Sequence, residues 1–323
     1  MSELFNPSFI LKNRHIQTLY SSLFRKDLKL EVEVERFYLD DGDFVECHWY
    51  NKPDTQTTHP IVILFHGLNG SYKSPYIQGA MKEASKKGFS VVVMHFRGCS
   101  GIPNNLPRAY HSGDSEDAKA WISHLHTTYV KAKLFGVGYS LGGNMLLKLV
   151  GEQSSHCILS AVVSVSAPMQ LDISANSILK GFSRFYQYLL VKDLNNALEK
   201  KFERFDMSKF ISLKKEDIKK LKTFWDFDDA YTAPMHNFKN AQDYYTKCSA
   251  KQFLKDIRVP TLIIHALDDP FMSSKILPSK DEISSSIELE VYAHGGHVGF
   301  ISGKFFSPIY WLEKRIVSYL EKI

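Results

Sequence analysis

Short, largely apolar runs recur along the chain and predict the strands of a buried sheet. They cover residues 61–65, 91–94, 134–137, 161–165 and 261–264. Because both faces of such a run are apolar, it is typical of a parallel strand that is covered on both sides. Polar and apolar residues alternate instead over 31–37 and 44–49, and Asp41-Gly42-Asp43 supplies a turn between these segments. This second pattern predicts a hairpin at an edge of the sheet.

Segments with helical spacing of apolar residues separate the predicted strands. The expected helices cover residues 76–87, 115–129, 141–152 and 308–322. Strands that alternate with helices through right-handed crossovers form a doubly wound, mostly parallel sheet. The pattern therefore predicts the α/β class.

One long interval breaks this alternation. Residues 168–251 contain no strand-like run and are rich in aromatic residues and lysine at helical spacing. We expect a helical cap there, inserted into a core made of residues 1–167 and 252–323. Such an insertion would cover the carboxyl ends of the strands, where ligands bind in open α/β sheets.

Composition fits a globular protein with a sizeable core. The 323 residues are 44% hydrophobic and 23% charged, and no apolar run approaches the length of a membrane-spanning helix. Residues 1–7 show no basic leader followed by an apolar segment, so we expect a cytoplasmic protein. Cys47, Cys99, Cys157 and Cys248 lie far apart, which favours separate, reduced thiols over a metal site or a redox pair.

Charge gives little indication of a macromolecular partner. The formal net charge is +5, and the densest basic stretch, residues 213–222, also carries Glu216 and Asp217. A solvated helix face explains it better than a nucleic-acid site. Weak contact with an anionic membrane surface stays open, although polar residues interrupt the apolar segment 9–24 and favour its packing against the body. No obligate protein partner is implied.

The segment 136–143, Gly-Val-Gly-Tyr-Ser-Leu-Gly-Gly, follows an apolar run and precedes a predicted helix. This is the context that a G-x-S-x-G nucleophile elbow requires. A serine in so sharp a turn is strained, and Gly138 and Gly142 are needed where a side chain would collide with neighbouring backbone. The pattern predicts Ser140 as the nucleophile of an α/β-hydrolase fold that carries an inserted helical lid.

A serine hydroxyl needs a histidine base, and a carboxylate must hold that histidine in the correct tautomer. In this fold the acid and then the histidine follow the serine in the chain. Asp268-Asp269-Pro270 follows the apolar run 261–264, and we favour Asp269 as the acid, with Asp268 as the alternative. His294 and His297 come next in the chain.

His297 is the better base because it follows two flexible glycines, whereas His294 has the character of a structural histidine. No clustered third ligand accompanies the two histidines, so we expect neither a metal nor an organic cofactor.

The oxyanion of an acyl-transfer intermediate needs at least two donors. One is usually the backbone N–H after the nucleophile, here that of Leu141. The second should come from the loop after the run 61–65, and we assign it to the backbone N–H of Leu68. His66 in the same loop is expected to brace it.

Several further motifs coincide with those of one family. They are Asn6-Pro7, 15–18 (His-Ile-Gln-Thr), 66–71 (His-Gly-Leu-Asn-Gly-Ser), 96–101, 110–113, 228–234, Tyr244-Tyr245, 266–271 and 294–300. In these motifs, over nearly its whole length, the chain resembles the YheT-like hydrolases of bacteria, the AB hydrolase 4 family of the AB hydrolase superfamily. That family includes relatives of the eukaryotic abhydrolase-domain proteins 1, 2 and 3. The chain departs from the pattern at Asn69, where many relatives carry Glu, and at Asn237, where Gly is common.

The resemblance implies that Ser140, Asp269 and His297 form a charge-relay triad. It also implies action on carboxylic esters of short to medium acyl chains, since relatives cleave such esters. Some eukaryotic relatives act on phospholipids or monoacylglycerols, or as alcohol acyltransferases.

Two other features can be explained by packing alone as well as by a function. Cys99 lies near the expected site, but nothing places it beside a base, so packing is the preferred role. Phe182, Phe185, Tyr186 and Tyr188 have helical spacing in the insertion. They fit ordinary packing of the lid, and our hypothesis is that they line an acyl pocket.

The sequence thus predicts a carboxylic ester hydrolase with a small-molecule ester as substrate. Transfer of the acyl group to an alcohol or thiol, or lipase-type activity, on the same triad is the alternative within enzymes. A catalytically silent binding module is the alternative outside them, because a fold alone does not confer activity.

Overall fold

A computed structural model describes residues 5–323 of the chain. Residues 1–4, which carry part of the prediction that no basic leader is present, lie outside the described residues. Among the described residues, no helix combines the length and the apolar character needed to cross a membrane.

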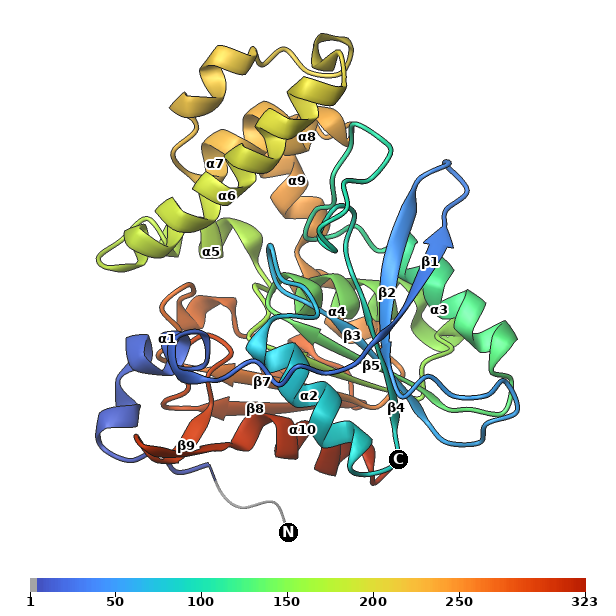
Figure 1. Ribbon diagram of the computed structural model, residues 1–323. Helices are drawn as coiled ribbons and strands as arrows, with labels where there is room; N and C mark the ends of the chain where they lie inside the picture. The colour runs from blue at the N-terminus through green and yellow to red at the C-terminus, as the bar shows by residue number, and fades with distance from the viewer. Residues whose placement is uncertain (1–4) are drawn as a thin grey trace.

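An eight-stranded sheet forms the centre of the molecule (Figure 1). Its strands are β1 (Glu33–Tyr38), β2 (Phe44–Tyr50), β3 (Ile61–Phe65), β4 (Ser90–Met94), β5 (Leu134–Tyr139), β6 (Ala161–Val165), β7 (Thr261–Ala266) and β8 (Ile287–Tyr292). The order is β1-β2-β4-β3-β5-β6-β7-β8. Strands β3 to β8 run parallel, whereas β1 and β2 form the antiparallel hairpin predicted for the sheet edge. The predicted α/β-hydrolase fold is confirmed.

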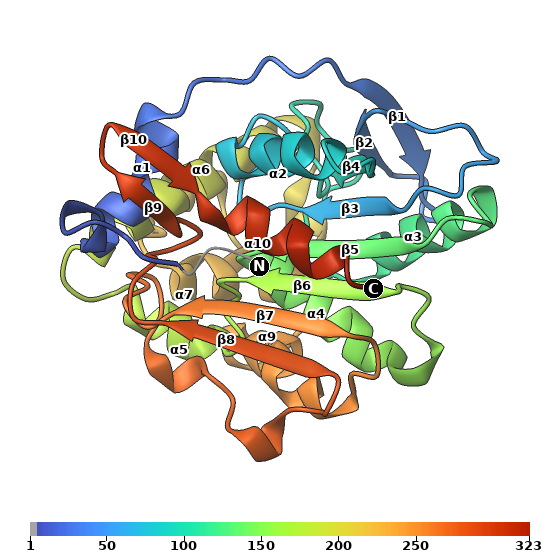
Figure 2. The same ribbon diagram turned by 90° about the horizontal axis from the view of Figure 1, so that it is seen from below.

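Helices cover both faces of this sheet, which explains why its strands are apolar throughout. The helices are α2 (Pro75–Ser85), α3 (Glu116–Thr128), α4 (Leu141–Gln153) and α10 (Trp311–Leu320). On β3, Ile61, Ile63 and Phe65 pack into the layer that contains α3 and α4. Val62 and Leu64 point the other way and pack with α2 and α10, and Figure 2 shows α10 crossing the strands on that face.

The described chain between β6 and β7 contains helices and turns, with no strand. Its helices are α5 (Leu171–Ser177), α6 (Ser183–Arg204), α7 (Phe224–Phe227), the π-helical turn η5 (Asp228–Thr232), α8 (Ala233–Met235) and α9 (Ala241–Cys248). Shorter 3₁₀ turns are η3 (Met207–Lys209), η4 (Lys215–Lys220) and η6 (Ala250–Asp256). Figure 1 shows this segment gathered above the sheet, and it has apolar clusters of its own around Leu198 and Tyr244.

The C-terminal helix begins later than predicted. Residues 307–310 form β10 (Ser307–Tyr310), which pairs with β9 (Ile301–Lys304) in a separate hairpin. The predicted start at Pro308 is therefore wrong, because the backbone stays extended up to Tyr310 and α10 begins at Trp311. Helix α1 (Arg14–Phe24), preceded by η1 (Ile10–Lys12), packs beside this hairpin through Leu11, Tyr20 and Ile301.

The remaining 3₁₀ turns connect these elements. They are η2 (Ser154–His156), η7 (Ser274–Ile276) and η8 (Lys280–Glu282).

Asn144 on α4 joins the segment between β6 and β7 to the loop before α3. It is fully buried on α4, donates to the carbonyl oxygens of Ser112 at 2.8 Å and Cys248 at 2.9 Å, and accepts from the N–H of Ala250 at 2.9 Å. The side chain therefore satisfies three backbone groups from two segments that are distant in sequence.

The substitution Asn144→Leu keeps the approximate shape of the side chain and leaves these three backbone groups without partners. We expect the free energy of unfolding to fall by about 3 kcal/mol, measured by urea denaturation at neutral pH. The control Asn196→Leu, at an exposed position on α6, should change it by less than about 0.5 kcal/mol. Equal effects of the two changes would contradict a role for Asn144 in joining the segments.

Candidate active site

Ser140 sits in a strained turn between β5 and α4. Its backbone angles are φ 51° and ψ −120°, in the left-handed half of conformational space that residues other than glycine avoid. A Cβ atom on Gly138 would lie 2.5 Å from the carbonyl oxygen of Gly142, and one on Gly142 would lie 2.5 Å from the carbonyl oxygens of Phe65 and His66. Both glycines are therefore required by close backbone contacts, as predicted.

His297 joins the serine to a buried carboxylate. Its Nε2 lies 2.9 Å from Oγ of Ser140, and its Nδ1 lies 2.8 Å from Oδ2 of Asp269. Asp269 is 2% exposed, and its other oxygen accepts from the N–H of Phe271 at 2.8 Å. An ionised carboxylate can only accept, so Nδ1 carries the proton and leaves Nε2 free to accept from the serine hydroxyl.

The other members of the two tandem pairs lie beside this chain of hydrogen bonds. Asp268 accepts from the N–H of Gly296 at 2.9 Å, and its other oxygen lies 3.4 Å from Nδ1 of His294. Burial raises the pKa of Asp268. Asp269, and not the alternative Asp268, is the carboxylate that contacts His297.

The ring of His297 is held from one face and from its backbone. The ring of Phe271 stacks on it at a centroid distance of 4.1 Å and an interplanar angle of 14°. The N–H of His297 donates to Oγ1 of Thr18 at 3.0 Å, and the N–H of Val298 donates to Oγ of Ser166 at 3.1 Å. These contacts fix the ring in the orientation that meets Ser140.

Helix α1 supports the histidine loop, a role that the sequence did not reveal. Gln17 is fully buried, its amide donates to the carbonyl oxygen of Ile301 at 2.8 Å, and it accepts from the N–H of the same residue at 2.8 Å. Gly296 has φ 56°, and a Cβ there would lie 2.6 Å from the carbonyl oxygen of Arg14. The motif His15-Ile16-Gln17-Thr18 was the available signal, but nothing local in it indicates a partner at the far end of the chain.

Two backbone amides near Ser140 are free. Neither the N–H of Leu68 nor that of Leu141 donates to another described group of the protein, and both residues line the cavity that contains Ser140. The Leu68 loop lies close to the elbow, because a Cβ on Gly67 would be 3.3 Å from Cβ of Ser140. Leu68 and Leu141 both line the cavity, and their role as oxyanion donors stays a prediction.

His66 braces the Leu68 loop from below. Its Nδ1 lies 2.7 Å from the carbonyl oxygen of Gly67, and its Nε2 accepts from the N–H of Phe96 at 3.2 Å. Burial lowers the pKa of His66 to about 4, so the ring is neutral at physiological pH. Asn69 follows with φ 54°, and its N–H donates to the hydroxyl of Tyr110 at 2.9 Å.

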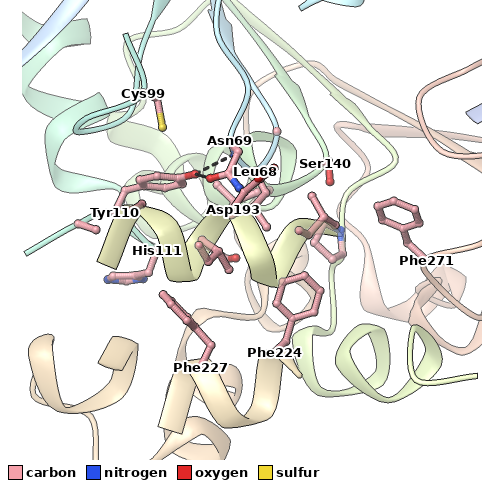
Figure 3. A pocket seen from close by; sticks show the side chains of 18 of the residues that line it. Leu68, Asn69, Cys99, Tyr110, His111, Ser140, Asp193, Phe224, Phe227 and Phe271 are labelled. Atoms are coloured by element: carbon pink, nitrogen blue, oxygen red, sulfur yellow. Dashed lines mark hydrogen bonds between the residues drawn. The ribbon is translucent and has the colours of Figure 1, made fainter. Parts of the chain in front are cut away.

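A cavity of about 760 Å³ opens over Ser140, between the core and the inserted helices (Figure 3). Figure 3 shows Leu68 and Ser140 on the core side of this space, with Phe224 and Phe227 facing them. Its apolar lining also includes Leu190, Leu194, Tyr231, Tyr244 and Met272. A cavity of this size and lining suits a small ester with an acyl chain.

Two of our hypotheses about neighbouring residues have different outcomes. Of the four aromatic residues proposed to line the pocket, Tyr186 does so. Phe182, directly before α6, and Phe185 and Tyr188 on α6 are exposed. That hypothesis is wrong for these three because helical spacing does not say which face of a helix is covered. Burial raises the pKa of the Cys99 thiol to about 12, so it stays protonated and packs beside the cavity.

Asp228 places a carboxyl group in the cavity wall, inside the π-helical turn η5. It accepts from the hydroxyls of Thr232 and Tyr245, each at 2.6 Å. Burial raises its pKa from 3.8 to about 6. A raised pKa means that the protonated form stabilises the folded state below pH 3.8, and that this contribution is lost as the pH rises through about 6.

We expect Asp228→Asn to reduce the change in the free energy of unfolding with pH between about pH 4 and about pH 6. The variant should gain free energy of unfolding relative to the parent as the pH rises from about 4 to about 6, because amide replaces a carboxyl that must otherwise ionise while buried. Urea denaturation across pH 3.5–7.5 measures the difference. Asp193→Asn, at an exposed position on the same cavity, should leave the profile unchanged, and identical profiles for both variants would contradict the assignment.

Residues 60–304 match the model of the α/β-hydrolase fold family, and the chain belongs to that family. Within it, the chain is 42% identical to YheT of Escherichia coli (strain K12), a protein named as a candidate esterase, over 98% of this chain and 92% of that protein.

More distant relatives and solved structures agree on the fold. The chain is 26% identical to mouse phospholipase ABHD3, over 94% of this chain and 74% of that protein. It is 30% identical to a monoacylglycerol lipase of Saccharomyces cerevisiae (strain ATCC 204508 / S288c), over 82% of this chain and 61% of that protein. The esterase Pf2001 of Pyrococcus furiosus superposes with a TM-score of 0.60 at 16% identity, covering 100% of this chain and 99% of that chain.

Proposed function

We propose that the protein hydrolyses carboxylic esters of short to medium acyl chains through an acyl-enzyme intermediate. The observation that carries the proposal is the unbroken hydrogen-bonded series Ser140–His297–Asp269, with distances of 2.9 and 2.8 Å, at the floor of an apolar cavity. The names of the relatives, which include an esterase, a phospholipase and a lipase, support the same reaction class.

The geometry fits the acylation half of the reaction. The hydroxyl of Ser140 attacks the ester carbonyl carbon while Nε2 of His297 takes its proton, and Asp269 stabilises the resulting imidazolium. The N–H groups of Leu68 and Leu141 bind the oxyanion of the tetrahedral intermediate. The intermediate collapses when the bond to the leaving alkoxide breaks and His297 delivers its proton to that oxygen.

Deacylation repeats these steps with water. His297 takes a proton from a water molecule that attacks the acyl-enzyme carbonyl, and the second tetrahedral intermediate releases the carboxylic acid and regenerates Ser140. No metal or organic cofactor enters this scheme. The segment 168–251 serves as a cap that shapes the acyl site, through Phe224 and Leu194 among other residues.

The direct test is hydrolysis of p-nitrophenyl esters from acetate to palmitate. Ser140→Ala should reduce kcat/KM by about 10⁴-fold or more, and Ser174→Ala, which changes another serine of the cavity wall, should retain most of the activity. An optimum at one chain length would size the acyl site, and product analysis with added alcohol would separate hydrolysis from acyl transfer. Equal rates for Ser140→Ala and the parent would exclude Ser140 as the nucleophile.

The tandem carboxylates provide a second, internally matched test. Asp269→Asn should lower kcat by about 10⁴-fold, because an amide holds the wrong tautomer of His297. Asp268→Asn should cause a far smaller loss, since Asp268 contacts Gly296 and His294 rather than the base. Steady-state kinetics on the best p-nitrophenyl ester decides between them, and a reversed order of the two losses would transfer the role of acid to Asp268.

A further inference from the structure

Exposed aromatic side chains gather on one side of the molecule. Eight phenylalanine and tyrosine residues are exposed within residues 5–323, and six of them come from the segment around α1, the tip of the β9–β10 hairpin and the start of α6. The six are Phe9, Phe24, Phe182, Phe185, Tyr188 and Phe306. Phe9 is 90% exposed and Phe306 is 95% exposed. Figures 1 and 2 both show α1, β9 and the start of α6 along the same, left-hand side.

Contacts connect the three segments into one surface, which we call the aromatic face. The ring of Phe24 lies 5.4 Å from that of Phe305, and Phe305 in turn lies 5.1 Å from Phe306. At the other end, the ring of His15 lies 4.7 Å from that of Phe182. Exposed aliphatic residues of the same segments, Ile10, Leu23, Leu179 and Leu189, extend it.

Unpaired cations are interspersed with these apolar side chains. All are exposed, and none forms an ion pair with a carboxylate of the described residues: Lys12, Arg14, Lys26, Lys180, Arg184, Lys192 and Lys304. An exposed apolar surface with a dispersed positive charge matches the interface of an anionic bilayer, where rings enter the headgroup region and cations meet lipid phosphates. A second copy of the chain fits less well, because a two-fold contact would bring these like charges together.

The aromatic face also borders the cavity above Ser140. Leu19 and Ser22 of α1 line that cavity, as do Tyr186 and Leu190 of α6. The two helices thus present exposed apolar residues outward and cavity-lining residues inward. An ester held in a bilayer at this face would reach Ser140 past the contact between α1 and α6, where Nδ1 of His15 lies 3.1 Å from the hydroxyl of Tyr186.

We propose that the aromatic face docks on the surface of an anionic phospholipid membrane and that the ester substrate enters from it between α1 and α6. Docking stands on the surface features alone. Delivery of the ester rests on the proposed hydrolase function, so the test measures docking separately from turnover.

The experiment compares two double variants of the full chain. Each replaces one cation by glutamate and the following phenylalanine by serine, but at a different place on the surface. R184E/F185S alters the aromatic face, and K209E/F210S alters a cation and an aromatic residue far along the inserted segment. Phe185 and Phe210 are 49% and 48% exposed, so both changes remove similar exposed surface. Co-sedimentation with vesicles of phosphatidylglycerol and phosphatidylcholine, and with phosphatidylcholine alone, gives the partition coefficient at low and high salt.

We expect the parent chain and K209E/F210S to bind the anionic vesicles equally, and R184E/F185S to bind at least about tenfold more weakly. Binding should weaken with salt and on vesicles without phosphatidylglycerol. Equal binding by the two double variants, or no binding by the parent chain at low salt, would overturn the proposal. The proposal would also be overturned if the parent chain formed a dimer in sedimentation-velocity runs without lipid and R184E/F185S were monomeric. The aromatic face would then be covered by a second copy of the chain.

Ser140→Ala separates this proposal from the proposed function. It should bind vesicles as the parent chain does, because docking needs no turnover. Vesicle binding by a parent chain that cleaves no ester would contradict the hydrolase function and leave docking intact, whereas ester cleavage without vesicle binding would do the reverse.

Discussion

The close approach of two stretches of backbone at the nucleophile elbow is the constraint on which the site depends. Gly142 lies so near the carbonyl oxygens of Phe65 and His66 that no side chain fits between them. This contact sets the β3 loop directly against the start of α4, and Leu68 and Leu141 line one cavity as a result. Ser140 adopts a strained backbone conformation, with φ 51°, in that arrangement. The conformation persists because β5, which precedes Ser140, and α4, which follows it, are both buried in the core.

Much of the core could be predicted because its signals are local. The run 61–65 is apolar at every position since alternate residues of β3 pack into layers on opposite faces of the sheet. The elbow glycines, and the order of Ser140, Asp269 and His297 along the chain, likewise follow from rules that concern a few neighbouring residues. The choice between Asp268 and Asp269 was open to sequence reasoning only as a preference, because one residue of register decides which carboxyl turns toward the histidine.

What the sequence could not reveal depends on contacts between distant segments. The role of Gln17 and Thr18 in holding the His297 loop needs the two ends of the chain to be placed side by side. The aromatic residues at the start of α6 show the same limit, since Tyr186 lines the cavity while Phe182 and Phe185 are exposed. Asn237 has φ 60°, a conformation that favours glycine, and the residue type alone does not reveal it.

The link between α1 and the histidine loop has a consequence for biosynthesis. The hydrogen bond from His297 to Thr18 spans 279 positions of sequence, and that from Gln17 to Ile301 spans 284. During translation the first partner of each pair leaves the ribosome long before the second exists, so the nascent chain carries Ser140 without an oriented base. The ring of His297 can therefore take its supported place against Ser140 only after the chain has been synthesised as far as Ile301.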